Sequence, residues 1–433
     1  MSMSIDGLVS GLGTSDLISQ LMQAESLGQT RLKNKVTSQQ KVIASFQSVN
    51  TRVASLKTAT ATLGDSSTWS AAKATASSDA ITVTAAAGAP TGKLILDMKE
   101  LAQATVKTSV VSPTGSIQDG TGVSITVAGT TTPVTVETDT AQGVVDAINT
   151  ANAGVSAALI SSDQGSVLQL TATKTGTAND FSISGLAPTL TTITAAADAK
   201  IAVGTVGAGG YTVTSATNTF TNLIPNVTIT ANRVENGISV AVGSDPDAIA
   251  AQVQSMVNAA NNLISEISSQ SAIAVGGAGS TTGGPLTGNS LVRELKQSVL
   301  SAVTNGMADY GSFSQLGVQT DRTGKLVFDK ATFVAAYQAD PAAVASAMTD
   351  GLAKSLNDLA SSANTNITSA IQSGNNTIRG LNDQVDNWDV RLELRQAALR
   401  KQFTNLEVAL GKMNEQSSWL ASQIASLGTS LEG

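Results

Sequence analysis

The sequence predicts an α+β multidomain protein in which both ends form one helical, coiled-coil leg and two nested, mainly antiparallel β domains are inserted between them. Near both ends, apolar residues recur at steps of three and four, as in helices that pair along a narrow seam. In the middle, short runs alternate apolar and polar residues between Gly, Asn, Asp and Ser, which is typical of strands. A length of 433 residues suits two to four domains.

The N-terminal part of the leg is predicted over residues 1–67, as a disordered start followed by a coiled-coil helix. Its helical stripe runs from about residue 36 to residue 63. The core positions of this stripe are Val42, Phe46, Val49, Val53, Leu56 and Leu63. A narrow stripe of this kind needs a partner helix to cover it.

The C-terminal part of the leg is predicted over residues 244–433. Its first helix begins after Asp245, which is placed to cap it, with Pro246 at the first helical position. Its last helix carries an apolar residue at every seventh position from Ile378 to Leu427. The predicted core of this coiled coil includes Leu392, Leu399, Phe403 and Leu406. We expect the two terminal seams to pack on each other within one chain; separate dimerisation of each seam is the alternative.

The middle of the chain is predicted to hold two β domains. Residues 68–107 and 216–243 are expected to form the first, and residues 108–215 the second. One helix interrupts the second domain, with Thr140 as its expected N-cap. The glycine-rich stretch GGAGSTTGGPLTGN is expected to be a flexible loop, because it lacks the Lys of a phosphate-binding loop.

Composition argues against an enzyme and against several classes of partner. The chain has neither cysteine nor histidine, which removes thiolate nucleophiles, thiolate metal sites and the commonest acid–base group. A net charge of −7 argues against nucleic acid as a partner. No apolar run approaches the roughly 20 residues that span a bilayer, so membrane insertion is not expected. We expect no cofactor.

Several stretches, in one shared order, carry a family resemblance. They are SIDGLVSGLGTSDLISQLMQAE, LILDMKELAQA, VVDAINTANAGVSAALI, TNTFTNLIPNVTIT, GPLTGNS, LGVQTDRTGKLVFD and LRKQFTNLEVALGKMNEQSSWLASQIASL. Together they resemble bacterial flagellar filament cap proteins, which are also classed among the hook-associated proteins. The chain departs from the family pattern at Gly13, where Asp is usual.

The resemblance implies a structural cap at the distal end of the flagellar filament, outside the cell. Such proteins pass unfolded through the flagellar export apparatus without a cleaved signal peptide. The implied partners are further copies in a homo-oligomeric ring, flagellin, hook–filament junction proteins and an export chaperone before secretion. The ring is expected to retain exported flagellin and guide its polymerisation, and the same protein can also act in adhesion.

The resemblance also implies two regions that contact the filament or neighbouring subunits. The expected contact residues at the start of the chain are Ile5, Leu8, Leu12, Leu17, Ile18 and Leu21. Those at the end are Leu410, Met413, Leu420, Ile424 and Leu427. Three alternatives remain open at this stage: flagellin or a hook–filament junction protein, a secreted adhesin that binds glycans, and a hydrolase built on carboxylates alone.

Overall fold

Both ends of the chain are helical and the middle is built of strands. The computed structural model describes residues 13–204, 209–275, 281–307 and 310–429. Contacts divide the chain into a helical unit and a β unit. The helical unit comprises Met1–Gly64, Val253–Ala336 and Ala342–Gly433, and the β unit comprises Asp65–Gln252 and Tyr337–Pro341. This arrangement confirms the predicted fold class.

The longest helices belong mainly to the helical unit. The helices outside the strand-rich region are α1 (Thr14–Glu25), α2 (Leu27–Gly64), α3 (Ser66–Trp69), α5 (Pro246–Gln270), α6 (Ser290–Thr304), α7 (Lys330–Ala339), α8 (Pro341–Ser346) and α9 (Lys354–Thr429). A π-helical turn, Ala347–Ala353, leads into α9. The 76 residues of α9 make a rod of roughly 110 Å at 1.5 Å per residue. The helical unit also contains two short strand pairs, β16 (Ile273–Val275) with β17 (Thr281–Gly283) and β18 (Val318–Thr320) with β19 (Leu326–Phe328). A 3-10 helix, Phe313–Leu316, precedes β18.

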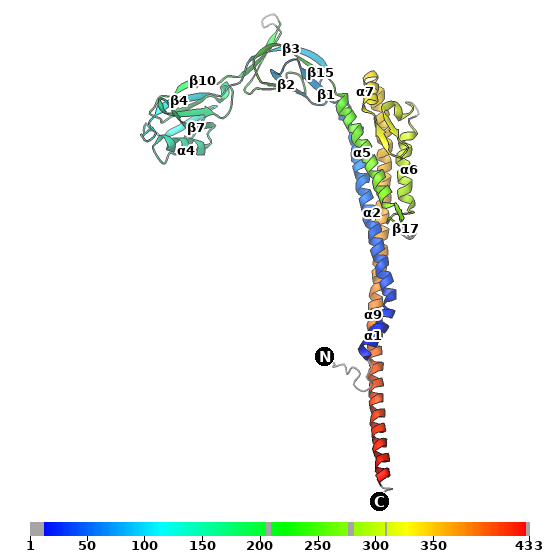
Figure 1. The fold of residues 1–433 in the computed structure, drawn as a ribbon. Helices are drawn as coiled ribbons and strands as arrows, with labels where there is room; N and C mark the ends of the chain where they lie inside the picture. The colour runs from blue at the N-terminus through cyan, green and yellow to red at the C-terminus, as the bar shows by residue number, and fades with distance from the viewer. Residues whose placement is uncertain (1–12, 205–208, 276–280, 308–309, 430–433) are drawn as a thin grey trace. The chain divides into compact units, whose positions relative to one another are not determined.

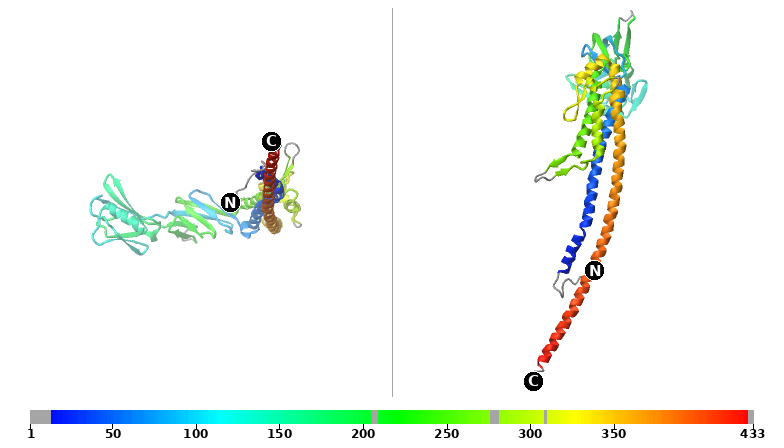
Figure 2. Two further views of the ribbon diagram at one scale, coloured as in Figure 1. Left: turned by 90° about the horizontal axis from the view of Figure 1, so that it is seen from below. Right: turned by 90° about the vertical axis from the view of Figure 1, so that its right-hand side faces the viewer.

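The core of the helical unit lies where α2 and α9 run side by side, with α5 along them (Figures 1 and 2). On α2, Val49, Val53 and Leu56 are completely buried, as are Leu356 and Ile367 on α9. Burial of each such side chain contributes roughly 1.5–3 kcal/mol. The two terminal seams therefore pack on each other within one chain, as expected.

One β cluster of the β unit is a two-layered sandwich. Its strands are β1 (Ala72–Ala76), β2 (Ile81–Ala85), β3 (Gly92–Glu100), β11 (Ala199–Val203), β12 (Tyr211–Ser215), β13 (Thr219–Thr221), β14 (Val227–Ala231) and β15 (Glu235–Ser244). The five-stranded sheet has the order β1-β15-β3-β11-β12 and the three-stranded sheet the order β13-β14-β2. All pairs within them are antiparallel. Met98, Ile229 and Val240 are buried between the two sheets.

The other β cluster has its own core and one helix. Its elements are β4 (Val106–Val111), β5 (Val123–Val127), β6 (Thr130–Val134), α4 (Ala141–Ala151), β7 (Val155–Ser162), β8 (Gly165–Ala172), β9 (Phe181–Ser184) and β10 (Thr191–Thr194). The sheets have the orders β10-β4-β8-β7 and β6-β5-β9. Helix α4 packs against β7 (Figure 1). Its expected cap is present, since Thr140 Oγ1 accepts a 3.2 Å hydrogen bond from the Gly143 N–H.

Three details differ from the sequence predictions. Strands β11 and β12, within the stretch assigned to the second β domain, instead extend the sheet of the first, because Ile201 pairs with Met98 and adds to that core. Residues 14–35, expected at least partly disordered, are helical, because Ile18 finds a buried position against α9. The described part of the glycine-rich loop contains strand β17, which pairs with β16 just before the loop.

Candidate assembly surface

Helices α2 and α9 approach each other closely at two glycine residues. Gly374 lies so near α2 that a Cβ built on it would stand 2.9 Å from Ile43 Cγ1. Gly28 makes a similar contact lower down, where a Cβ would lie 2.7 Å from Cζ2 of Trp388. At both positions only glycine leaves room for the facing side chain. These contacts fix the spacing of the two helices.

Polar groups fix the register of the same helices. The Gln29 amide donates a hydrogen bond to the Asp389 carboxylate. Within α9 itself, the Arg391 guanidinium lies 4.8 Å from the centre of the Trp388 ring, within range of a cation–π interaction, and this contact does not join the two helices. Further down, Arg395 Nε lies 3.2 Å from Glu25 Oε1 at the end of α1. Exposed ion pairs of this kind contribute at most about 1 kcal/mol, so they align the helices more than they stabilise them.

A second polar cluster joins α2 to α5. Ser48 Oγ donates a 2.7 Å hydrogen bond to Glu266 Oε1, and Gln270 Nε2 donates to the same oxygen at 2.8 Å. Gln270 Oε1 in turn accepts from Ser45 Oγ at 2.7 Å. The hydrogen bonds from Ser48 and then Gln270 lower the pKa of Glu266. The charged form of Glu266 is therefore part of the native helix contact.

The lower part of α9 exposes apolar side chains. Helix α1 covers one side of α9 as far along the helix as about Glu407. In this contact, Ile18 of α1 is 7% exposed and Leu399 of α9 is 8% exposed. Beyond about Glu407 no other described helix accompanies α9 (Figure 1 and the right-hand view of Figure 2). Four side chains on one side of the helix, the first apolar row, are 44–64% exposed. They are Leu406, Met413, Leu420 and Ile424.

The predicted coiled-coil core is mostly covered, with one correction. Phe46, Val49, Val53, Leu56, Leu63 and Leu399 are buried, and Val42, Leu392 and Phe403 are half-buried. Leu406 was expected in this core but is 44% exposed. The covered side of α9 instead passes through Leu399, Phe403 and Glu407. A straight helix has 3.6 residues per turn, so a seven-residue row drifts about 20° per heptad away from a fixed partner.

The predicted contact residues fall into three groups. Leu17 and Leu21 on α1 are exposed, and Met413, Leu420 and Ile424 on α9 are more exposed still. Ile18 is buried against α9 and Leu410 is half-buried, so these two face the chain's own helices more than a partner. Ile5, Leu8 and Leu12 lie outside the described residues, and Leu427 lies in α9 but its side chain is outside the described part.

Sequence reasoning missed a further set of exposed apolar residues on α9, the second apolar row. They are Val390, Leu394, Val408 and Trp419, between 54% and 68% exposed. At 100° per residue these side chains point about 130° away from the first apolar row. The available signals were the four-residue step from Val390 to Leu394 and the eleven-residue step from Val408 to Trp419, which corresponds to about three turns.

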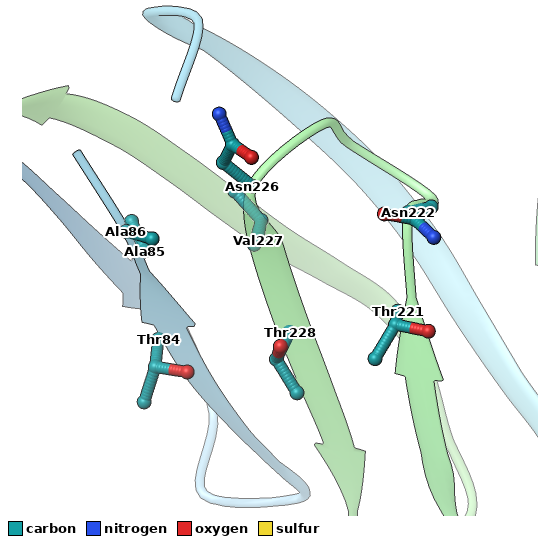
Figure 3. A pocket seen from close by; sticks show the side chains of 8 residues that line it. All are labelled: Thr84, Ala85, Ala86, Thr221, Asn222, Asn226, Val227 and Thr228. Carbon is teal, nitrogen blue, oxygen red and sulfur yellow. The ribbon is translucent and has the colours of Figure 1, made fainter. Parts of the chain in front are cut away.

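An open hollow of about 310 Å³ lies between β2, β13 and β14 of the β unit (Figure 3). Thr84, Thr228 and Thr221 are direct cross-strand neighbours there, and Asn222 and Asn226 complete its polar wall. None of the residues that line it has a titratable side chain. The hollow therefore offers hydrogen bonds to a neutral ligand and no acid–base chemistry.

Neither a cluster of metal-binding side chains nor a membrane-spanning helix occurs among the described residues. Within residues 13–204, 209–275, 281–307 and 310–429, no cluster of three or more acidic side chains is placed to hold a metal ion. No helix in that part of the chain is long and apolar enough to cross a membrane.

Comparisons with known proteins agree with this architecture. The family model "Flagellar hook-associated protein 2 C-terminus" matches residues 196–415, and its N-terminal counterpart matches residues 10–105. Flagellar hook-associated protein 2 of Escherichia coli (strain K12) is 26% identical, with 98% of each chain covered. The B-type protein of Pseudomonas aeruginosa is also 26% identical, over 97% of this chain and 98% of the relative.

A solved structure shows the same fold. The crystal structure of the flagellar cap protein FliD from Escherichia coli has a TM-score of 0.58 and 24% sequence identity, over 76% of this chain and 99% of that chain. The C-terminal family model alone covers more than half of the sequence. The chain therefore belongs to the flagellar hook-associated protein 2 family, the family of flagellar cap proteins.

Proposed function

We propose that this chain caps the distal end of a bacterial flagellar filament outside the cell, where copies form a ring that retains exported flagellin and guides its polymerisation. Family membership supports the flagellar role. The observation that carries the proposal is the lower part of α9, which displays apolar side chains beyond the reach of α1. Soluble monomers seldom expose such a surface unless a partner covers it.

The proposed mechanism is non-covalent. Met413, Leu420 and Ile424 lie on one side of α9, and burial of each against a helix of a partner would contribute roughly 1.5–3 kcal/mol. A leg held in this way keeps the β unit at the growing tip, where exported subunits are confined until they enter the lattice. Positioning of this kind requires no acid, base or cofactor.

The route and the partners follow from the same proposal. The chain leaves through the flagellar export apparatus as an unfolded polypeptide, with its N-terminal segment uncleaved, and an export chaperone holds it beforehand. The absence of cysteine supports this route, because cross-links would prevent threading through a narrow channel. Flagellin and the hook–filament junction proteins are its neighbours after export.

Deletion of the gene tests the function directly. We expect short or absent filaments, with monomeric flagellin in the medium, and recovery when purified protein is added. A variant that ends after residue 405 should fail to restore growth, because it keeps the contacts of Leu399 and Phe403 but lacks the lower part of α9. Filaments of normal length in the deletion strain would exclude the cap role.

Adhesion is a second proposed role, which the hollow of the β unit favours. Its hydroxyl and amide groups are uncharged and suit a neutral glycan. Binding of the full chain to a glycan array should fall when Thr228 is replaced by Val, which keeps the shape and removes one hydroxyl. Equal binding by Thr228→Val and the parent chain would exclude this hollow as the site.

A further inference from the structure

The two apolar rows of α9 cannot be covered by one partner helix. The first row is Leu406, Met413, Leu420 and Ile424, and the second row is Val390, Leu394, Val408 and Trp419. They point about 130° apart around the helix axis, whereas a helix pair buries a single narrow seam. Val390 and Leu394 also lie where α1 and α2 already occupy another side of α9, near the Glu25–Arg395 ion pair. The second row must therefore be covered from outside the chain's own helix pair.

The two rows are matched in height along the helix. Leu406 and Val408 are two residues apart, and Leu420 and Trp419 are adjacent, so each pair lies within about 3 Å along the axis. At a third level, a hollow of about 200 Å³ lies beside Trp388, lined also by Gln384, Asn387 and Arg391. Val390 of the second row stands at that same level.

The hollow beside Trp388 belongs to the side of the first row. At 100° per residue, its four lining residues point on average within about 40° of that row. Along α9 toward its C-terminus, the side of the first row therefore presents the hollow beside Trp388, then Leu406 and then Leu420. The other side presents Val390, then Val408, then Trp419, at corresponding heights.

Charge decides how two copies can meet. The second row includes Lys401 and Lys412 on its side of the helix, by the same angular count. If the second rows of two parallel helices packed against each other, each lysine would lie opposite the same lysine of the other copy. Such a contact between like charges is unfavourable. Between residues 402 and 424 the side of the first row holds no charged residue. The stem of Lys412 of a neighbouring copy can therefore lie along it without meeting a like charge.

We propose that the first row of one copy packs in register against the second row of a neighbouring copy, with Val390 entering the hollow beside Trp388. Each copy then uses two different faces, which is a head-to-tail contact that closes into a ring when the rotation between copies allows it. The partner is thus a second copy of this chain. This inference rests on the proposed cap function and assigns the leg a part in joining the ring.

Cysteine cross-linking tests the contact, because the chain has no cysteine of its own. The double variant Leu406→Cys/Val408→Cys is produced in the deletion strain, and its flagella are mildly oxidised and analysed by size under non-reducing conditions. Both positions are exposed, at 44% and 54%, so the fold should tolerate cysteine there. The two side chains point to opposite sides of one helix and cannot join within a copy.

We expect covalent dimers and larger multimers of the double variant. Neither single variant should give them, because a Cys on one face meets no Cys on the other. The pair Leu406→Cys/Trp419→Cys is the control for height, since about 20 Å separates its positions along the helix and a disulfide cannot bridge that distance.

Three results would overturn the proposal: no multimers from the double variant, dimers from Val408→Cys alone, or efficient multimers from the height control. A photo-crosslinking amino acid at Val408 identifies the occupant, and an adduct with a filament subunit in place of a second copy would also overturn it. Filament growth is scored in the same strains. Restored growth without cross-links contradicts the leg contact alone, whereas normal growth of the deletion strain contradicts the cap function itself.

Discussion

The upper and lower parts of α9 have similar amphipathic sequences and opposite environments. In the upper part, Leu356, Ala360 and Ile367 are completely buried. In the lower part, Met413, Leu420 and Ile424 are more than half exposed. An apolar stripe therefore indicates that a helix face is to be buried, but it does not indicate which partner buries it. The chain's own helices bury the upper residues, which thus stabilise the fold. The lower residues stay exposed and can contact another molecule during assembly.

The largest expected effect on folding is in the upper part. Leu56→Ala on α2 removes a completely buried side chain and should lower the free energy of unfolding of the helical unit by about 2–5 kcal/mol. Denaturant unfolding followed by the helical circular dichroism signal measures this loss. The equivalent change at Leu420 is the matched control, and a similar loss there would contradict the division of α9 into two functional parts.

The next effect compares two glycines within helices. Gly28→Ala places a Cβ 2.7 Å from the Trp388 ring and should destabilise the helical unit by about 1–3 kcal/mol. Gly380→Ala meets nothing within 4 Å and should stabilise it by up to about 1 kcal/mol, because alanine is the better helix former. In the same unfolding measurement, the two variants should therefore change the free energy of unfolding in opposite directions. Stabilisation by both would show that α2 and α9 are not held as closely as described.

A smaller effect depends on pH and on the Glu266 cluster. Because the pKa of Glu266 is lowered in the folded state, its stabilising contribution is complete above the ordinary carboxyl pKa of about 4.3 and is lost as the pH falls through the folded value. Glu266→Gln should therefore reduce the difference in denaturation midpoint between pH 7 and pH 3. Ser48→Ala, which removes the main hydrogen-bond donor, should act in the same direction. An unchanged difference in both variants would contradict this cause.

The smallest expected effect on folding accompanies a large one on assembly. Leu420→Gln lies on the exposed part of α9 and should change the free energy of unfolding by less than about 0.5 kcal/mol. It should nevertheless impair filament growth in the deletion strain, because it places a polar group in the first apolar row. Asn414→Gln, on neither row, should leave both stability and growth unchanged. Normal growth with Leu420→Gln would remove this residue from the assembly surface.

Much of the architecture could be predicted from local pattern. The seven-residue recurrence to Leu427 predicted the long terminal helix, and Thr140 and Asp245 predicted helix starts that the structure contains. Alternation predicted the strands, because a residue's side of a sheet changes at every step. The border between the β clusters was less predictable. The placement of β11 beside β3 depends on pairing over about 100 residues of sequence, and no local signal marks it.

For the assembly surface, the sequence by itself determined that apolar rows exist near the C-terminus and that Met413, Leu420 and Ile424 belong to one of them. Tertiary structure decided which residues are covered. It buried Ile18, exposed Leu406 and revealed the row through Val408 and Trp419. The physical reason is that periodicity fixes directions around one helix axis, whereas exposure depends on where partner helices end and how the row drifts past them.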